Sequence, residues 1–221
     1  MYLMPEIAVI FDMDGVLLDT ERLMMECFLQ AARELGLPCL PEAYLSTLGV
    51  SERDTLQIYA EQFGGIKTAA ALLTREIELT RAHIVRCGAP VKAGAEELLS
   101  FLQRRGCRLA LASSNQREYI DAELKSAGLL HYFEAIVSAD TVAHAKPHPE
   151  IYMRVFALLH APAAEGFAVE DAPAGIAAAH AAGLKPILVP DLLPPDEAVK
   201  RLAHKVVSTL DEARVYFASI L

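Results

Sequence analysis

The sequence predicts an α/β protein with a doubly wound, Rossmann-like parallel sheet and an all-helical segment inserted after the first strand. Two observations support this fold class. In the second half of the chain, short apolar runs rich in β-branched residues alternate with amphipathic helical patterns. Between residues 20 and 90 this alternation stops, and every pattern has the period of a helix.

The first predicted strand is the apolar run at residues 7–11, which is followed directly by Asp12. A continuous run of this length fits a strand that is buried on both faces, as in parallel sheets. Similar runs lie at residues 108–112, 135–137, 166–169 and 186–189. Helices are predicted between them, several ending at a glycine, at residues 95–105, 118–127, 149–159 and 174–182.

The segment at residues 20–90 is predicted to form a separate domain, and residues 1–19 and 91–221 form the core. Helices are expected in the segment at residues 21–35, 41–48, 52–63 and 68–86. An insert after the first strand lies over the carboxyl edge of the sheet, where open α/β folds bind ligands. We therefore expect a cap; the alternative is a helical domain that takes no part in the site.

Composition and charge restrict the class of protein. The chain has 221 residues, 53% of them hydrophobic, so it can bury a full core. A formal net charge of −9 argues against binding to nucleic acid or to an anionic membrane surface. The four cysteines are widely spaced and favour reduced thiols. No signal-peptide pattern or apolar run of about 20 residues is present, so we expect a cytoplasmic protein.

Two carboxylates, Asp12 and Asp14, follow the first predicted strand. Residues two apart point to the same side, so both side chains leave the sheet together. Such a pair can supply a nucleophile and a general acid, or two metal ligands. Taken alone, the pattern fits a strand-end turn with a capping aspartate equally well.

Polar residues also follow other predicted strands. A hydroxyl at Ser113 could bind an anion, or it could cap the helix that follows. Lys146 precedes a proline, which keeps the backbone extended; an isolated lysine in a loop is usually only solvated. The candidate residues of this group are Ser113, Ser114, Asn115, Lys146, Glu170 and Asp171.

Four segments, in order along the chain, resemble the motifs of the haloacid dehalogenase-like (HAD) hydrolases. They are Phe11-Asp-Met-Asp-Gly-Val-Leu-Leu-Asp-Thr-Glu21, Leu111-Ala-Ser-Ser-Asn115, Ala145-Lys-Pro-His-Pro-Glu-Ile-Tyr152 and Val169-Glu-Asp-Ala-Pro-Ala-Gly-Ile176. The resemblance spans the core, and the insert has the position of the helical cap in the β-phosphoglucomutase-like branch. It implies a Mg²⁺-dependent phosphohydrolase.

The resemblance implies a role for each matching residue. Asp12 would be the nucleophile that forms an aspartyl-phosphate, and Asp14 would protonate the leaving group and later deprotonate water. Lys146 would neutralise the charge of the phosphoryl group. The phosphoryl oxygens would be bound by Ser113, Ser114 and Asn115.

A Mg²⁺ site made of oxygen ligands is also implied by the resemblance. Its ligands would be Asp12, the backbone carbonyl of Asp14, and the pair Glu170 and Asp171, of which Asp171 is the preferred direct ligand. Asp14 and the acidic pair suit a metal and a phosphoryl group. We therefore do not expect the dehalogenase reaction.

The expected substrate is a small phosphorylated metabolite, either a sugar phosphate or a nucleoside-type phosphate monoester, and phosphatase activity is our first hypothesis. A sugar phosphomutase is the second, although Met24 and Glu52 differ from the residues that β-phosphoglucomutases have at these positions. The third is a catalytically silent binding module. In the insert, Arg53 beside the Gly49 turn and Thr20 at the start of the first helix are the predicted substrate contacts. The alternative for Arg53 is a solvated residue on a helix face.

The seven histidines show no spacing that is typical of a metal site. His144 and His148 lie on either side of Lys146 and are expected to be loop residues. We assign them no part in catalysis.

Overall fold

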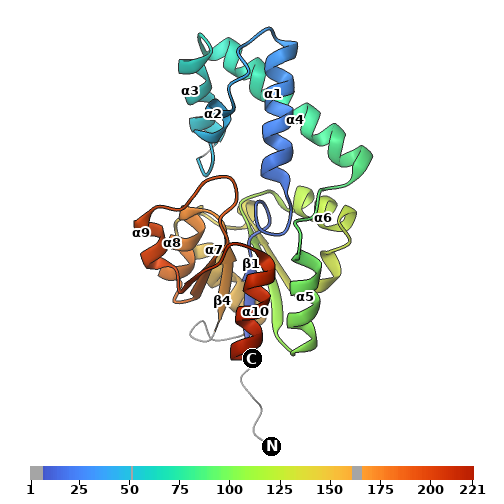
Figure 1. Ribbon diagram of the computed structural model, residues 1–221, viewed down its shortest axis with the longest axis vertical. Helices are drawn as coiled ribbons and strands as arrows, with labels where there is room; N and C mark the ends of the chain where they lie inside the picture. Colours follow the sequence, from blue (N-terminus) through green and yellow to red (C-terminus); the bar gives the residue numbers. More distant parts are fainter. Residues whose placement is uncertain (1–6, 51, 161–165) are drawn as a thin grey trace, which may run out of the picture. The chain divides into compact units, whose positions relative to one another are not determined.

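The computed structural model describes residues 7–50, 52–160 and 166–221. It divides into two compact units, one formed by Met1–Asp19 and Val91–Leu221 and the other by Thr20–Pro90 (Figure 1). We call them the sheet unit and the helical unit. Within the described ranges, no helix is both long enough and apolar enough to cross a membrane.

The sheet unit is built on six parallel strands in the order β3-β2-β1-β4-β5-β6. β1 pairs with β2 on one side and with β4 on the other, so the strand order reverses at β1. Ligands of doubly wound sheets bind at this switch point, beyond the carboxyl ends of the strands. The predicted fold class is confirmed. The strands are β1 (Ala8–Phe11), β2 (Arg108–Ser113), β3 (Ala135–Ser138), β4 (Phe167–Glu170), β5 (Lys185–Leu188) and β6 (Lys205–Val206).

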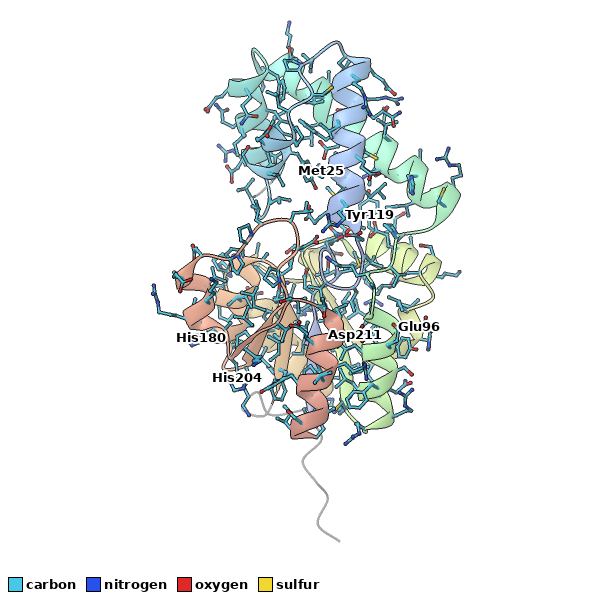
Figure 2. The ribbon with its side chains drawn as sticks, viewed as in Figure 1. Met25, Glu96, Tyr119, His180, His204 and Asp211 are labelled. Carbon is cyan, nitrogen blue, oxygen red and sulfur yellow. The ribbon has the colours of Figure 1, made fainter. Side chains whose placement is uncertain are left out.

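Helices cover both faces of the sheet. α7 (Glu150–Leu159) and α8 (Pro173–Ala181) pack on the face that contains Ala110 and Ala168. Phe167 points to the opposite face, where its ring lies 5.2 Å from that of Phe217. Two helices lie side by side there, with Glu96 on one and Asp211 on the other (Figure 1, Figure 2): α5 (Ala95–Arg104) and α10 (Leu210–Ile220). The sheet unit also contains α6 (Arg117–Ser126), α9 (Glu197–Leu202) and short 3-10 helices at Leu130–Tyr132 and Ala139–Thr141.

The helical unit has an aromatic core. Phe28 lies at ring distances of 5.9 Å from Tyr44, 5.2 Å from Tyr59 and 6.1 Å from Phe63. Aromatic pairs at such distances add to the stability that burial provides. Phe28, Tyr44 and Tyr59 belong to three different helices, and Phe63 directly follows the third, so their contacts tie the helices together. The helices are α1 (Thr20–Glu34), α2 (Pro41–Leu45), α3 (Glu52–Gln62) and α4 (Ile66–Cys87).

The strands and helices predicted from the sequence are all present, and the ends of most agree within two residues. The helix expected at residues 41–48 is wrong at its end, because it stops at Leu45. The hydroxyls of Ser46 and Thr47 donate to backbone carbonyls at 2.8 and 2.7 Å, and such local bonds favour turns over helix. The sequence analysis missed β6, α9 and α10, although Asp196 and Thr209 cap the two helices.

Glu76 is a buried carboxyl group in the helical unit. It is 3% exposed and accepts a hydrogen bond from the hydroxyl of Tyr59 at 3.3 Å. Burial raises its pKa to about 8; the Tyr59 bond opposes the rise, and the charge of Glu21 adds to it. In the folded chain, Glu76 is therefore largely protonated at neutral pH.

We predict that Glu76 lowers the stability of the chain as the pH rises. Between its ordinary pKa of 4.5 and the folded value of about 8, the folded chain keeps a proton that the unfolded chain loses. The free energy of unfolding should therefore fall across this window. Glu76→Gln should remove that dependence and raise stability at pH 8 by a few kcal/mol, on the order expected from the shift.

Urea unfolding followed by circular dichroism between pH 5 and about pH 9 checks this prediction. Glu78→Gln, on the exposed side of the same helix, is the matched control and should leave the pH dependence in place. Equal pH profiles for the wild type and Glu76→Gln would contradict the prediction.

Candidate active site

Asp12 stands at the carboxyl end of β1, where the sheet fixes its position. Its backbone N–H donates to the carbonyl of Val169 at 3.0 Å, which extends the pairing of β1 with β4 by one residue. The residue is 9% exposed. The chain then turns at Gly15, whose φ of 71° suits glycine and whose N–H donates to Leu18 at 2.9 Å. This turn holds Asp14 close to the same edge of the sheet.

The ammonium group of Lys146 makes three hydrogen bonds across the strand ends. It donates to Asp12 Oδ1 at 2.6 Å, to Glu170 Oε1 at 2.7 Å and to the carbonyl of Ala112 at 2.9 Å. These acceptors belong to the ends of β1, β4 and β2. The side chain is 6% exposed, so water has little access to the ammonium group. The three bonds satisfy all three of its N–H donors.

Glu170 is held from two sides. The hydroxyl of Tyr152 on α7 donates to Oε1, the oxygen that also accepts from Lys146. On α8, Gly175 lies so close that a Cβ at this position would overlap the Glu170 carboxylate. Glu170 is 1% exposed. It therefore anchors Lys146, and glycine at position 175 lets α8 pass beside it.

The carboxylates keep Lys146 charged. Burial alone lowers the pKa of its ammonium group, but Asp12 and Glu170 outweigh burial and raise the pKa above its ordinary value. Lys146 is therefore a cation at neutral pH. Burial also raises the pKa of Glu170, and Lys146 opposes that rise by favouring the carboxylate. The site thus combines a fixed positive charge with several acidic groups.

Asn115 connects the end of β2 to Asp14. Its side-chain amide donates to Asp14 Oδ2 at 2.9 Å, and its backbone N–H donates to Ser113 Oγ at 3.1 Å. Ser113 is buried, and Ser114 is exposed. The N-cap of α6 is Gln116, so the alternative interpretation of Ser113 as the helix cap is wrong.

A cluster of carboxylate oxygens could hold a metal ion. Asp12, Glu170 and Asp171 each offer an oxygen, and these atoms lie within 4.8 Å of one another. Gly15 lies against Asp171, where a Cβ would overlap the carboxylate. A set of oxygen donors suits a hard cation such as Mg²⁺. Glu170 is the most deeply buried of the three and accepts from both Lys146 and Tyr152, whereas Asp12 accepts from Lys146.

The predicted site residues separate into two groups. Those of the sheet unit follow the ends of its strands or lie on the loop of Lys146, and all except Ser114 take part in the contacts described above. Thr20 and Arg53 belong to the helical unit, where Thr20 is buried at the first residue of α1 and Arg53 is exposed on α3. The roles of all these residues in catalysis and binding stay predictions.

Sequence reasoning missed two residues of the site, Tyr152 and Gly175. Both lie inside the quoted motifs, but each also fits an ordinary helix facing a sheet. Their side-chain contacts with Glu170 depend on how α7 and α8 pack on the sheet. The signal in the sequence that could have pointed to Tyr152 was its position six residues after Lys146.

The strand-end residues all fall within residues 9–189, which match the model of a family described as haloacid dehalogenase-like hydrolase. The chain belongs to this family. A phosphorylated carbohydrates phosphatase from Thermotoga maritima is 34% identical to it over 181 residues, which cover 81% of this chain and 83% of the relative. The family and its phosphatase members make the chain a hydrolytic enzyme.

Solved structures of HAD hydrolases share its fold. One from Deinococcus radiodurans R1, with bound phosphate and sodium, has a TM-score of 0.80 and 28% identity, and covers 97% of this chain and 96% of its own. A CbbY mutant from Rhodobacter sphaeroides, in complex with xylulose-(1,5)bisphosphate, has a TM-score of 0.75 and 25% identity. The match covers 95% of this chain and 96% of the CbbY chain.

We predict that Gly175→Ala destabilises this HAD hydrolase. Within a helix, replacing glycine by alanine normally stabilises by up to about 1 kcal/mol. Here the added methyl group would overlap the Glu170 carboxylate, so the free energy of unfolding should fall by roughly 1–3 kcal/mol, as in an overpacked core. Urea unfolding measures the change, and a more stable variant would show that Glu170 is not held against α8.

Proposed function

We propose that this HAD hydrolase is a cytoplasmic, Mg²⁺-dependent phosphatase of small phosphorylated metabolites, sugar phosphates above all. It would act through an aspartyl-phosphate on Asp12. The observation that carries the proposal is the buried Asp12 carboxylate, 2.6 Å from the Lys146 ammonium at the switch point of the sheet. The Thermotoga maritima relative, a phosphatase of phosphorylated carbohydrates, and the sugar bisphosphate bound to CbbY support this substrate class.

In the first half of the reaction, an oxygen of Asp12 attacks the phosphorus atom of the monoester. The new bond joins Asp12 to phosphorus, and the bond from phosphorus to the ester oxygen breaks. Asp14 gives its proton to the departing oxygen, so the product leaves as an alcohol. Asn115 orients the Asp14 carboxyl group for this transfer through its 2.9 Å bond.

In the second half, water attacks the phosphorus atom of the aspartyl-phosphate. Asp14, now a carboxylate, takes a proton from the water, and the bond between phosphorus and Asp12 breaks. Inorganic phosphate leaves and both aspartates return to their starting states. Lys146 stays bonded to Asp12 and Glu170 and offsets negative charge on the phosphoryl oxygens.

The charge count requires a further cation. A phosphate monoester brings about two negative charges to an edge that already carries several carboxylates. Within the contacts described, Lys146 supplies one positive charge to these groups. A Mg²⁺ ion held by Asp12 and Asp171 would supply the remaining neutralisation.

The helical unit is proposed to act as the cap over this edge and to set specificity. The chain leaves the sheet unit after Asp19, a few residues beyond Asp14, and returns to it at Val91. The helical unit is therefore inserted close in sequence to the end of β1. A cap excludes bulk water during transfer to Asp12. We propose that Arg53 and Thr20 contact the non-reacting part of the substrate.

Asp12→Asn tests the nucleophile. The amide cannot attack phosphorus, so phosphate release from sugar phosphates should fall by several orders of magnitude while circular dichroism stays unchanged. Asp211→Asn, an exposed change on α10 (Figure 2), is the control and should retain full activity. Appreciable turnover by Asp12→Asn would refute the covalent mechanism.

Metal removal tests the charge argument. EDTA should abolish phosphate release, and Mg²⁺ added in excess should restore it. Ca²⁺ should restore little activity, because its longer and more variable bonds to oxygen disturb the geometry of phosphoryl transfer. Phosphate release measured on metal-free protein checks this, and full activity there would contradict the proposed role of Mg²⁺.

A further inference from the structure

A second group of metal-binding side chains lies on the segment that carries Lys146. His144 and His148 belong to the loop before α7, and Glu150 is the first residue of that helix. Each offers one ligand atom, and these atoms lie within 4.8 Å of one another. The sequence analysis assigned no metal site here, although the three residues between His144 and His148 fall within the range that zinc sites use.

The distances suit a small divalent ion. His144 Nδ1 lies 2.8 Å and His148 Nδ1 lies 3.9 Å from Glu150 Oε2. Two ligands of a tetrahedral Zn²⁺, each about 2.0–2.1 Å from the metal, are separated by about 3.3 Å. The two observed distances lie on either side of this value. Small ring rotations would therefore bring three donors into range of one ion.

The backbone prepares Glu150 for this role. Its carboxylate accepts hydrogen bonds from the N–H groups of Ala143 at 2.8 Å and His144 at 3.0 Å. These bonds fix the carboxylate in place on the loop. The N–H of Glu150 in turn donates to His148 Nδ1 at 3.3 Å. The lone pair of this nitrogen therefore lies on the side of Glu150, and a bound ion would take the place of this hydrogen bond.

The two imidazole rings are near each other and reachable from solvent. Their centroids are 4.5 Å apart, and the side chains of His144 and His148 are 64% and 50% exposed. An ion could therefore enter without any rearrangement of the core. Binding would displace the proton shared between His144 Nδ1 and Glu150 Oε2, as metal binding to histidine does.

We propose that His144, His148 and Glu150 form a binding site for a first-row transition metal ion of the Zn²⁺ type. Two imidazoles and one carboxylate select such ions over Mg²⁺ and Ca²⁺, which prefer oxygen donors. The site is thus chemically distinct from the cluster of Asp12, Glu170 and Asp171. The bound ion would join the loop to α7 on both sides of Lys146.

The test is a Zn²⁺ titration of the tag-free, full-length chain against a chromophoric chelator, with excess Mg²⁺ present to occupy the acidic cluster. The wild type should bind about one Zn²⁺ per chain. His144→Ala combined with His148→Ala should weaken binding by more than about tenfold, since the loss of supporting groups alone has such effects. His131→Ala combined with His180→Ala, which removes two other exposed histidines, should bind like the wild type.

Circular dichroism shows whether each variant is folded, and electron paramagnetic resonance of bound Cu²⁺ gives an independent readout. Nitrogen coupling should be present in the wild type and lost in the His144→Ala and His148→Ala double variant. The inference is overturned if Zn²⁺ binds the double variant as tightly as the wild type, or if Mg²⁺ abolishes Zn²⁺ binding. Neither result depends on phosphatase activity, so the two proposals fail separately.

Discussion

The buried ammonium group of Lys146 joins the ends of three strands, and the rest of the site depends on it. Its bonds to Asp12 and Glu170 compensate two carboxylates that would otherwise repel each other in a region with little water. Removing one partner of such a buried group typically costs about 3–5 kcal/mol. The parallel register makes the arrangement possible, because Phe11 pairs with both Leu111 and Val169 and so brings the following residues level.

The packing of α7 and α8 on the sheet accommodates this ion pair. Glu170 must point at Lys146, so the helices on that face have to accommodate a buried carboxylate. α7 does so with the hydroxyl of Tyr152, and α8 does so with the missing side chain of Gly175. Alanines on the strands and on α8 let both helices come close enough to make these contacts. The apolar core therefore positions the polar site.

The strands and most of the helices could be predicted because each depends on local sequence, whereas the candidate site residues were singled out by their resemblance to the four family motifs. A buried parallel strand has an unmistakable apolar run, and the residue after it must lie at the carboxyl edge. The partners of these residues could not be predicted, since the contacts of Tyr152, Gly175 and Asn115 depend on how separate elements pack. β6 was not predicted because its two exposed residues show no periodicity. α9 was not predicted because its six residues span less than two helical turns, too few to show a helical pattern.

Two buried glutamates show how a neighbouring cation changes the charge state of a carboxyl group. Glu76 and Glu170 are both almost fully buried, at 3% and 1% exposure, and burial raises the pKa of each. At Glu76 the hydroxyl of Tyr59 opposes this rise only in part, so burial leaves the group largely neutral at pH 7. At Glu170 the ammonium of Lys146 favours the charged form. Burial by itself therefore favours the neutral carboxyl group, and a lysine fixed at the strand ends opposes this effect.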